Sequence, residues 1–504
     1  MKKAILLCTL LLTAAAAFAA PVGKERAVRV AQNAVALFCA ELHNIDTKQP
    51  VELSPVDLGM EPKLYIFNYR NNDIEGFIIV SGDDMADPVL AFSDEGMLDL
   101  SGSYDGSTPA KNPAFEDHLL HYMNQIDLGR EAKVAAPAHV ALKWQKLENG
   151  NLEAKGDFFH DRINNLLKTN WDQGTPYNRH CPRNSVTGCV ATAFGMIMRY
   201  WKYPEHGFGM HSYNGADNPA AYPDWSYGVL SADFEHTYYD WDNMPQRISI
   251  QSTGAEIEAV STLLYHLGVA FDMRYSPNGS GTWSLPEYAL FDTSLHLSPD
   301  VSAPVRLRKH FGYKFSYSGM RDSIGDDTLW MQMIYNSLSD QKPVYYAGWA
   351  KDDSPAGHSG TSGHGYVIDG YFSDEVDSNL FHINWGWGGQ ADGFFKLDAM
   401  TPNRNDFTQW HGAVIGMEPD TSYHGYDYTD IPATPAATHS LYSRNGTIVA
   451  SGVAGETVTL FDIMGRRLDS RPALPADTWS LAVKPGVYIV KIGQSAGQKI
   501  IVLQ

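Results

Sequence analysis

A cysteine stands at the start of an apolar helix pattern in the stretch TGCVATAFGMIMRYW, residues 187–201. Apolar residues recur there every three or four positions, the spacing of one helix face: Val190, Phe194, Ile197 and Trp201. This pattern places Cys189 at or near the helix N-terminus, where unpaired backbone N–H groups and the helix dipole favour a thiolate. Since free cysteines also pack as small apolar residues, the pattern alone leaves a nucleophile and a core cysteine both open.

A cysteine nucleophile needs a base, a group that orients the base, and donors for an oxyanion. His364 is the first candidate base, because it opens the strand pattern HGYVIDG directly after a Gly/Ser-rich stretch. His358 lies within that stretch and is a rival. His382 is a second rival, because two-residue alternation places it on the same strand face as Asn384. The residue pattern does not exclude either rival.

The other members of a cysteine site also have candidates. Asn384 ends the strand pattern LFHINW, and its amide oxygen would accept from an imidazole on a paired strand. Trp385 would shield that bond from water. The alternative for Asn384 is an Asx turn before Gly386. Gln173, in the upstream stretch NWDQGTPYN, would form an oxyanion hole with the backbone N–H of Cys189. Taken alone it is only a loop glutamine.

Other chemistries have less support. The sequence has no HExxH motif, no CxxC pair and no calcium-loop spacing of acids, so we expect no metal and no cofactor. The formal net charge of −20 argues against nucleic acid as a partner, because phosphate binding needs clustered Lys and Arg.

The N-terminus has the pattern of an export signal. Residues 1–20, MKKAILLCTLLLTAAAAFAA, combine two lysines, an apolar run and a small-residue end. Once Cys8 leaves with the signal peptide, Cys39, Cys181 and Cys189 remain, and an odd count leaves at least one free thiol. A Cys181–Cys189 disulfide is an alternative that would consume the candidate nucleophile. No later apolar run is long enough to span a bilayer, so we expect no transmembrane segment.

The length of 504 residues suggests roughly three domains. An α+β unit is expected over 21–150, with helix patterns at 25–42 and 113–127 around strand patterns at 64–69, 76–84 and 89–96. The polar stretch 143–157 is interpreted as an exposed linker, and residues 158–168 have a helix-like pattern. A second unit over 151–420 ends in strand patterns at 343–349, 365–371, 380–385 and 392–398. A linker, 421–438, precedes a small all-β sandwich over 439–504.

Five motifs in order over roughly 160–420 resemble the streptopain family of papain-like cysteine proteases: WDQGTPYN, TGCVATAFGMIMRYWKYP, PVYYAG, SGHGYVIDGY and INWGWGGQADGFFKLDA. The resemblance implies an α+β fold with a helical lobe and an antiparallel β lobe. It implies Cys189 as nucleophile, His364 as general base and acid, and Gln173 in the oxyanion hole. It also implies Asn384 and Trp385 as the orienting and shielding residues, and it disfavours His382 as the base.

Both ends of the chain carry further resemblances. The stretch GFIIVSGDDMADPVLAFSDEG resembles a streptopain-inhibitor domain. The stretches TVTLFDIMGRRLDS, GVYIVKIG and KIIV together resemble a type IX secretion sorting domain. They imply an endopeptidase made as a zymogen, with its own pro-domain as inhibitor and the secretion machinery as a partner. The expected location is outside a Gram-negative bacterium or on its outer surface, reached through the periplasm.

The resemblance also implies protein or peptide substrates, with Gly363 and Ser280 as substrate contacts. Maturation would cut the expected linker, with Lys143, Lys146 and Lys155 as possible cut points. Two alternatives from other classes remain: a papain-like amidohydrolase or transglutaminase, and a catalytically silent surface-binding protein.

Overall fold

The structure is a computed structural model. It describes residues 20–502, with gaps at 47–50, 57–62, 100–111, 151–160, 216–226, 283, 286–301, 351–362, 374–378, 401–408, 426–439 and seven short stretches after residue 444. The expected signal peptide and the rival base His358 lie outside the described residues. No helix in the described ranges is long and apolar enough to cross a membrane.

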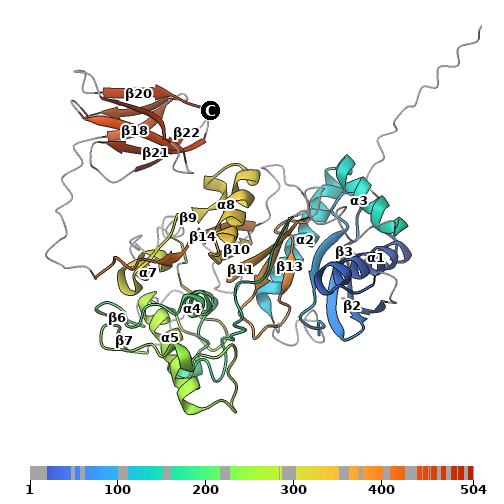
Figure 1. Ribbon diagram of the computed structural model, residues 1–504, viewed down its shortest axis with the longest axis horizontal. Coiled ribbons are helices and arrows are strands. Elements are labelled where there is room, and N and C mark those ends of the chain that lie inside the picture. The colour runs from blue at the N-terminus through green and yellow to red at the C-terminus, as the bar shows by residue number, and fades with distance from the viewer. Residues whose placement is uncertain are drawn as a thin grey trace, which may run out of the picture.

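The N-terminal part of the chain is an antiparallel sheet with helices packed on both faces (Figure 1). Its elements are α1 (Lys24–His43), β1 (Glu52–Val56), β2 (Leu64–Asn71), β3 (Ile74–Ser81), β4 (Val89–Ser93), α2 (Pro113–Glu131) and α3 (Ala138–Asn149). Successive strand residues point to opposite faces. Ile78 therefore packs with α1 and α3, whereas Phe77 and Ile79 pack with α2. The helices and strands expected in this part are confirmed.

The expected exposed linker is wrong for residues 143–149, because α3 runs through them. Lys143 is buried and its ammonium donates to Asp87 at 2.9 Å, while Trp144 and Leu147 pack in the core formed with α1. An ammonium paired inside the core is not accessible to a protease, so Lys143 is excluded as a cut point. Lys155 lies outside the described residues.

The central part of the chain supplies the rest of the sheet. Its strands are β5 (Asp161–Ile163), β6 (Met210–Asn214), β7 (Val229–Asp233), β8 (Tyr313–Lys314), β9 (Tyr317–Met320), β10 (Val344–Ala350), β11 (Gly363–Ser373), β12 (Asn379–Asn384), β13 (Gly393–Phe395), β14 (Gln409–Ile415) and β15 (Glu418–Pro419). The main sheet runs β1-β2-β3-β4-β13-β12-β11-β10-β14-β9. Since β4 pairs antiparallel with β13, the N-terminal and central parts share one continuous sheet.

Helices cover both faces of the central strands. They are α4 (Cys189–Trp201), α5 (Gly254–Ala270), α7 (Ala303–Phe311) and α8 (Asp327–Ser339), with 3-10 turns at Pro182–Asn184, Trp241–Asn243 and Arg321–Ser323. Val367 of β11 shares a core with α4, α5 and α7, whereas its neighbours Tyr366 and Ile368 share a core with α8 and α2. Strand β11 therefore lies between the helix that carries Cys189 and a helix of the N-terminal part.

The helix expected over 158–168 is wrong. Residues 161–163 form β5, which pairs with the end of β11. The backbone N–H of Leu166 donates to the Asp369 carbonyl, and that of Leu167 donates to the Asp369 carboxylate, both at 2.8 Å. These donors are therefore satisfied by the sheet rather than by a helix of their own.

The C-terminal part contains only strands among its described residues: β16 (Ser440–Arg444), β17 (Thr447–Ser451), β18 (Thr457–Asp462), β19 (Arg467–Pro472), β20 (Thr478–Ala482), β21 (Gly486–Ile492) and β22 (Gln498–Val502). They form one three-stranded and one four-stranded antiparallel sheet. Ile448 and Trp479 of the first sheet share a buried core with Val458 and Val490 of the second.

The junction between β4 and β13 depends on a glycine. A Cβ at Gly393 would lie 2.7 Å from Ser93 Cβ and 2.8 Å from the Phe92 carbonyl oxygen, so Gly393→Ala should force β4 away from β13. We expect a loss of about 1–3 kcal/mol of unfolding free energy in a Cys189→Ala background, measured by denaturant titration. Gly254→Ala is the control, because its Cβ would meet no atom within 4 Å. Equal stability of the two variants would contradict this account of the junction.

Candidate active site

Cys189 is the first residue of α4, as the sequence predicts. The residue before it, Gly188, has φ +90°, and a Cβ there would lie 2.9 Å from the Met273 side chain and 3.0 Å from the Ser280 carbonyl. Only glycine fits this turn. Because α4 is buried from Val190 to Met198, the helix is fixed in place, and the residue Cys189 at its start is half-buried.

The thiol of Cys189 contacts β11. The backbone N–H of Gly365 donates to Cys189 Sγ at 3.4 Å. Burial would raise the pKa of the thiol, but the hydrogen bond and charge of His364, with the N–H groups of Gly365 and Val190, leave that pKa below its usual value. The surroundings therefore favour a thiolate paired with an imidazolium. The roles of Cys189 as nucleophile and of His364 as base stay predictions.

The imidazole of His364 also contacts the N-terminal part of the chain. Its Nε2 lies 3.2 Å from Oδ2 of Asp117 on α2. The two groups form an ion pair, but the angle between them is unsuited to a hydrogen bond. Alternation along β11 places His364 on the face that α2 covers, which explains the contact. Burial would lower the pKa of His364, but Asp117 and Cys189 raise it to about 9.

Asp117 was not among the residues predicted from the sequence. Its only local signal is a place within the helix pattern 113–127, where an acidic residue is ordinary. The docking of α2 against β11, which no spacing reveals, makes it part of the site.

Gln173 lies beside the turn that carries Cys189. Its backbone carbonyl accepts from the Thr187 N–H at 3.0 Å, which ties the two loops together. Its side chain is 4% exposed, and its Nε2 has no acceptor in the part of the chain that the structure describes. A buried amide donor of this kind suits an oxyanion hole, and that role stays a prediction.

Asn384 makes other bonds than the predicted one to His364. Its Nδ2 donates to the Thr169 carbonyl at 2.7 Å, and its Oδ1 accepts from the Gly386 N–H at 3.1 Å, which is the Asx turn considered as the alternative. No Asn384–His364 bond occurs among the described residues, where His364 Nε2 faces Asp117 instead. The orienting role of Asn384 therefore stays a prediction.

Trp385 is fully buried between β11 and α2. Its ring centroid lies 4.8 Å from that of Tyr366 and 6.2 Å from that of Phe115, and its Nε1 donates to the Ala391 carbonyl at 2.9 Å. Trp385, which the sequence predicts as a shield, therefore packs in part against α2 of the N-terminal part of the chain. Its shielding role also stays a prediction.

Known proteins match both parts. Residues 171–395 match the Peptidase C10 family, and residues 19–108 match the Spi protease inhibitor family. Streptopain of Streptococcus pyogenes is 28% identical over 398 residues, which cover 74% of this chain and 85% of streptopain. The thiol protease/hemagglutinin PrtT of Porphyromonas gingivalis is 30% identical over 379 residues, 71% of this chain and 37% of PrtT. A solved fragment of Prevotella intermedia prointerpain A has a TM-score of 0.50 and 27% identity, covering 72% of this chain and 98% of the fragment.

The chain carries a Peptidase C10 domain. It is a cysteine peptidase, and a Spi-inhibitor-like domain precedes the catalytic one. We call residues 20–149 the Spi-like domain, which consists of the matched residues together with α2 and α3 packed on the same sheet. We call residues 161–419 the C10 domain, which extends the matched range to β5, β14 and β15. The predicted resemblance to the streptopain family and the mixed α+β fold are confirmed. The resemblance of the C-terminal strands to a sorting domain stays a prediction.

The rival base His382 is bound into a carboxylate network. Its Nδ1 lies 2.6 Å from Asp369 Oδ1, and its Nε2 lies 3.2 Å from Oε1 of Glu95, in the Spi-like domain. Burial would lower its pKa, but Asp369 and Glu95 raise it to about 10. A buried imidazolium between two carboxylates links the two domains and is unsuited to act as a base at neutral pH.

The other two cysteines of the described chain are also free, and Cys181 forms no disulfide with Cys189. Burial raises the pKa of Cys181 to about 12 and that of Cys39 to about 11. Cys189 is thus the thiol of the C10 domain whose surroundings favour ionisation. Cys39 is buried in the core formed with α1.

The two predicted substrate contacts lie near the site. Gly363 is the first residue of β11, one position before His364. Ser280 is buried and its hydroxyl donates to the Val186 carbonyl at 2.6 Å, which supports the turn before Cys189. Contact of either residue with substrate stays a prediction.

The Glu95–His382 contact should make the stability of the zymogen depend on pH. The pKa of Glu95 lies below its usual 4.5, so its contribution to the free energy of unfolding is present above about pH 4.5 and is lost as pH falls. The pKa of His382 is raised to about 10, so its contribution is full below about pH 6.5 and is lost toward pH 10. In a Cys189→Ala background, Glu95→Gln should lower the unfolding free energy by about 1 kcal/mol near pH 6 and by less at pH 3 or pH 10.

Denaturant titrations at the three pH values measure this difference. The control is Glu75→Gln, which removes an exposed pair with Arg70 inside the Spi-like domain and should change little. A Glu95→Gln effect that stays the same at all three pH values would rule out the linkage.

Proposed function

We propose that the chain is the zymogen of a secreted papain-like cysteine endopeptidase with a helical and a β lobe. The observation that carries the proposal is the contact of Cys189 with β11, with a lowered thiol pKa beside the imidazole of His364. This pair joins a nucleophile to its base, and the matches to streptopain and PrtT support peptide-bond hydrolysis as its use.

In the proposed reaction the Cys189 thiolate attacks the carbonyl carbon of a peptide bond. The side-chain amide of Gln173 and the backbone N–H of Cys189 stabilise the tetrahedral oxyanion. His364 gives its proton to the leaving amine, and a thioester remains on Cys189. The neutral imidazole then takes a proton from water, whose oxygen attacks the thioester and releases the carboxylic acid product.

The Spi-like domain is the proposed intramolecular inhibitor. Asp117 holds the Nε2 side of His364, and α2 packs against Trp385. While this helix stays docked, Nε2 remains paired with a carboxylate and Asn384 remains in its turn. Release of the domain would free Nε2 for the amide of Asn384, which would then orient the imidazole, with Trp385 covering the bond.

The remaining parts of the proposal concern location and substrate. The N-terminal signal pattern supports export to the periplasm, and the resemblance of the C-terminal strands to a sorting domain supports transfer to the outer surface or beyond. Protein substrates would contact Gly363 and Ser280. A bulky apolar residue is expected two positions upstream of the cut, as the family resemblance implies.

Cys189→Ala should accumulate as the uncleaved zymogen and show no hydrolysis of casein, because it lacks the attacking sulfur. Electrophoresis over time and release of casein peptides measure the two effects, with Cys181→Ala as the matched control that should mature and cleave. Self-maturation and casein cleavage by Cys189→Ala would overturn the mechanism. Ammonia release without peptide cleavage by the wild-type protein would instead indicate the amidohydrolase alternative.

Asp117→Asn should speed maturation, because a neutral amide no longer pairs with the imidazolium. Without the carboxylate the pKa of His364 should fall from about 9. We expect maturation about fivefold faster, the effect of about 1 kcal/mol for a pair with a partly exposed carboxylate. The measurements are the rate of zymogen processing and the pH profile of Cys189 alkylation.

The matched control is Asp127→Asn on the same helix, since Asp127 pairs with Lys63 inside the Spi-like domain. If Asp117→Asn and Asp127→Asn mature at the wild-type rate and share its alkylation profile, Asp117 has no role in latency.

A further inference from the structure

Three buried side chains from distant parts of the sequence meet where the Spi-like domain packs on the C10 domain. They are His121 of α2, Asp398 just after β13, and His411 of β14. One ligand atom from each lies within 4.8 Å of the other two. The closest pair is His121 Nε2 and Asp398 Oδ1, at 3.0 Å.

His411 shows that the local hydrogen bonds do not satisfy this cluster. Its Nδ1 is 2.8 Å from the Tyr346 hydroxyl, which fixes the ring. His411 is 2% exposed, and its Nε2 is buried without a hydrogen-bond partner in the described part of the chain. A buried nitrogen without a partner is costly, and an imidazole bonded through Nδ1 presents Nε2 as a ligand atom.

Asp398 uses its two oxygens for different partners. Oδ2 accepts from Arg321 Nη1 at 2.7 Å, and Arg321 shares its charge with Asp327 at 3.0 Å. Oδ1 accepts from His121 Nε2 and from Gln125 Nε2 at 3.1 Å. Burial would raise the pKa of Asp398, but Arg321 and His121 hold it well below its usual value, so the carboxylate is an anion. Oδ1 therefore faces His121, while Oδ2 faces the guanidinium of Arg321.

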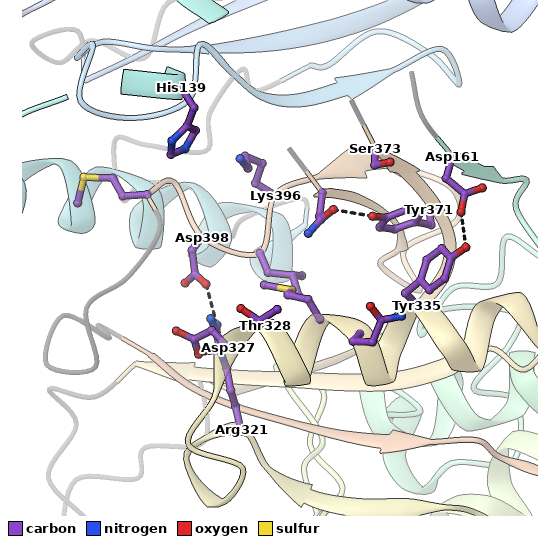
Figure 2. A pocket seen from close by; sticks show the side chains of 15 residues that line it. His139, Asp161, Arg321, Asp327, Thr328, Tyr335, Tyr371, Ser373, Lys396 and Asp398 are labelled. Carbon is purple, nitrogen blue, oxygen red and sulfur yellow. Dashed lines mark hydrogen bonds and ion pairs between the residues drawn. The ribbon is translucent and has the colours of Figure 1, made fainter. Parts of the chain in front are cut away.

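A cavity of about 590 Å³ borders the cluster at Asp398, and neither His121 nor His411 lines it. Asp398 and Arg321 lie in its wall, together with His139 of α3 and Lys396, and Figure 2 shows the Asp398–Arg321 contact at the edge of the cavity. An ion could reach Asp398 by this route, and water in the cavity could complete its coordination.

We propose that His121, Asp398 and His411 bind a divalent transition-metal ion of the zinc class across the junction of the two domains. Two imidazole nitrogens and one carboxylate oxygen suit zinc, with the fourth position taken by water. The rival arrangement is a cluster held by hydrogen bonds alone, with His121 Nε2 bonded to Asp398 Oδ1. That arrangement leaves His411 Nε2 without a partner among the described residues, whereas a metal ion satisfies all three groups.

The ion would join the Spi-like domain to the C10 domain, since His121 belongs to the first and the other two ligands to the second. The inference requires only that the two domains are docked. It uses none of the peptidase chemistry, so failure of the metal test leaves the proposed function unaffected, and the reverse also holds.

The test uses the full-length Cys189→Ala zymogen, which lacks the reactive thiol and should keep its inhibitor domain. After treatment with a chelator, calorimetric titration with Zn²⁺ should show one ion bound per chain. His121→Gln and His411→Gln should each weaken binding at least about tenfold. His236→Gln is the matched control, because His236 pairs with Asp233 on the surface and should not affect binding.

Co²⁺ should give the visible absorption of a low-coordinate site in the parent zymogen and lose it in His411→Gln. Tyr346→Phe removes only the hydroxyl next to His411 and should weaken Zn²⁺ binding with the fold kept. Circular dichroism confirms folding of each variant. Absence of stoichiometric binding, or wild-type binding by both His121→Gln and His411→Gln, would overturn the proposed metal site.

Discussion

The imidazole of His364 lies between two acidic groups that belong to different domains. On one side is the thiol of Cys189, whose pKa it lowers, and on the other is the carboxylate of Asp117. An imidazolium in that position stabilises the thiolate and, at the same time, the docked arrangement of the two domains. Under the proposed function, the geometry that prepares the nucleophile is therefore also the geometry that keeps it inactive.

Similar chemistry recurs along the junction of the two domains. Glu95 contacts His382, and His121 contacts Asp398, so in all three pairs one member comes from the Spi-like domain. Buried charges are costly unless paired, and breaking such a pair costs more than the pair contributes. The three pairs thus favour one docked arrangement over others, while the β4–β13 pairing supplies hydrogen bonds that do not depend on pH.

The three cysteines show how position decides reactivity. Cys39 and Cys181 are enclosed by the core, and burial raises the pKa of each thiol. Cys189 is also desolvated, but the N–H groups of Gly365 and Val190 and the charge of His364 outweigh burial. The same side chain therefore has a raised pKa in two places and a lowered pKa in the third, because only Cys189 lies at a helix start beside an imidazole.

The sequence alone was enough to predict features that depend on local spacing. The three-to-four-residue apolar pattern predicted α4 with Cys189 at its start, and strand patterns predicted β2, β3 and β10 to β13. The resemblance of the motifs to a known family predicted that Cys189 and His364 belong to the same site. Local pattern failed where a partner strand or helix decided the outcome: residues 161–163 pair with β11 instead of forming a helix, and Lys143 is buried against Asp87.

The tertiary structure alone decided the contacts between the domains. Asp117 reaches His364 across 247 positions of sequence, and His121 and His411 are similarly distant, so no motif of fixed spacing contains them. Such contacts arise when α2 docks on a sheet whose strands come from both domains. Periodicity describes what a segment does with its own neighbours, whereas the latency contact and the proposed metal site depend on which surfaces the folded chain brings together.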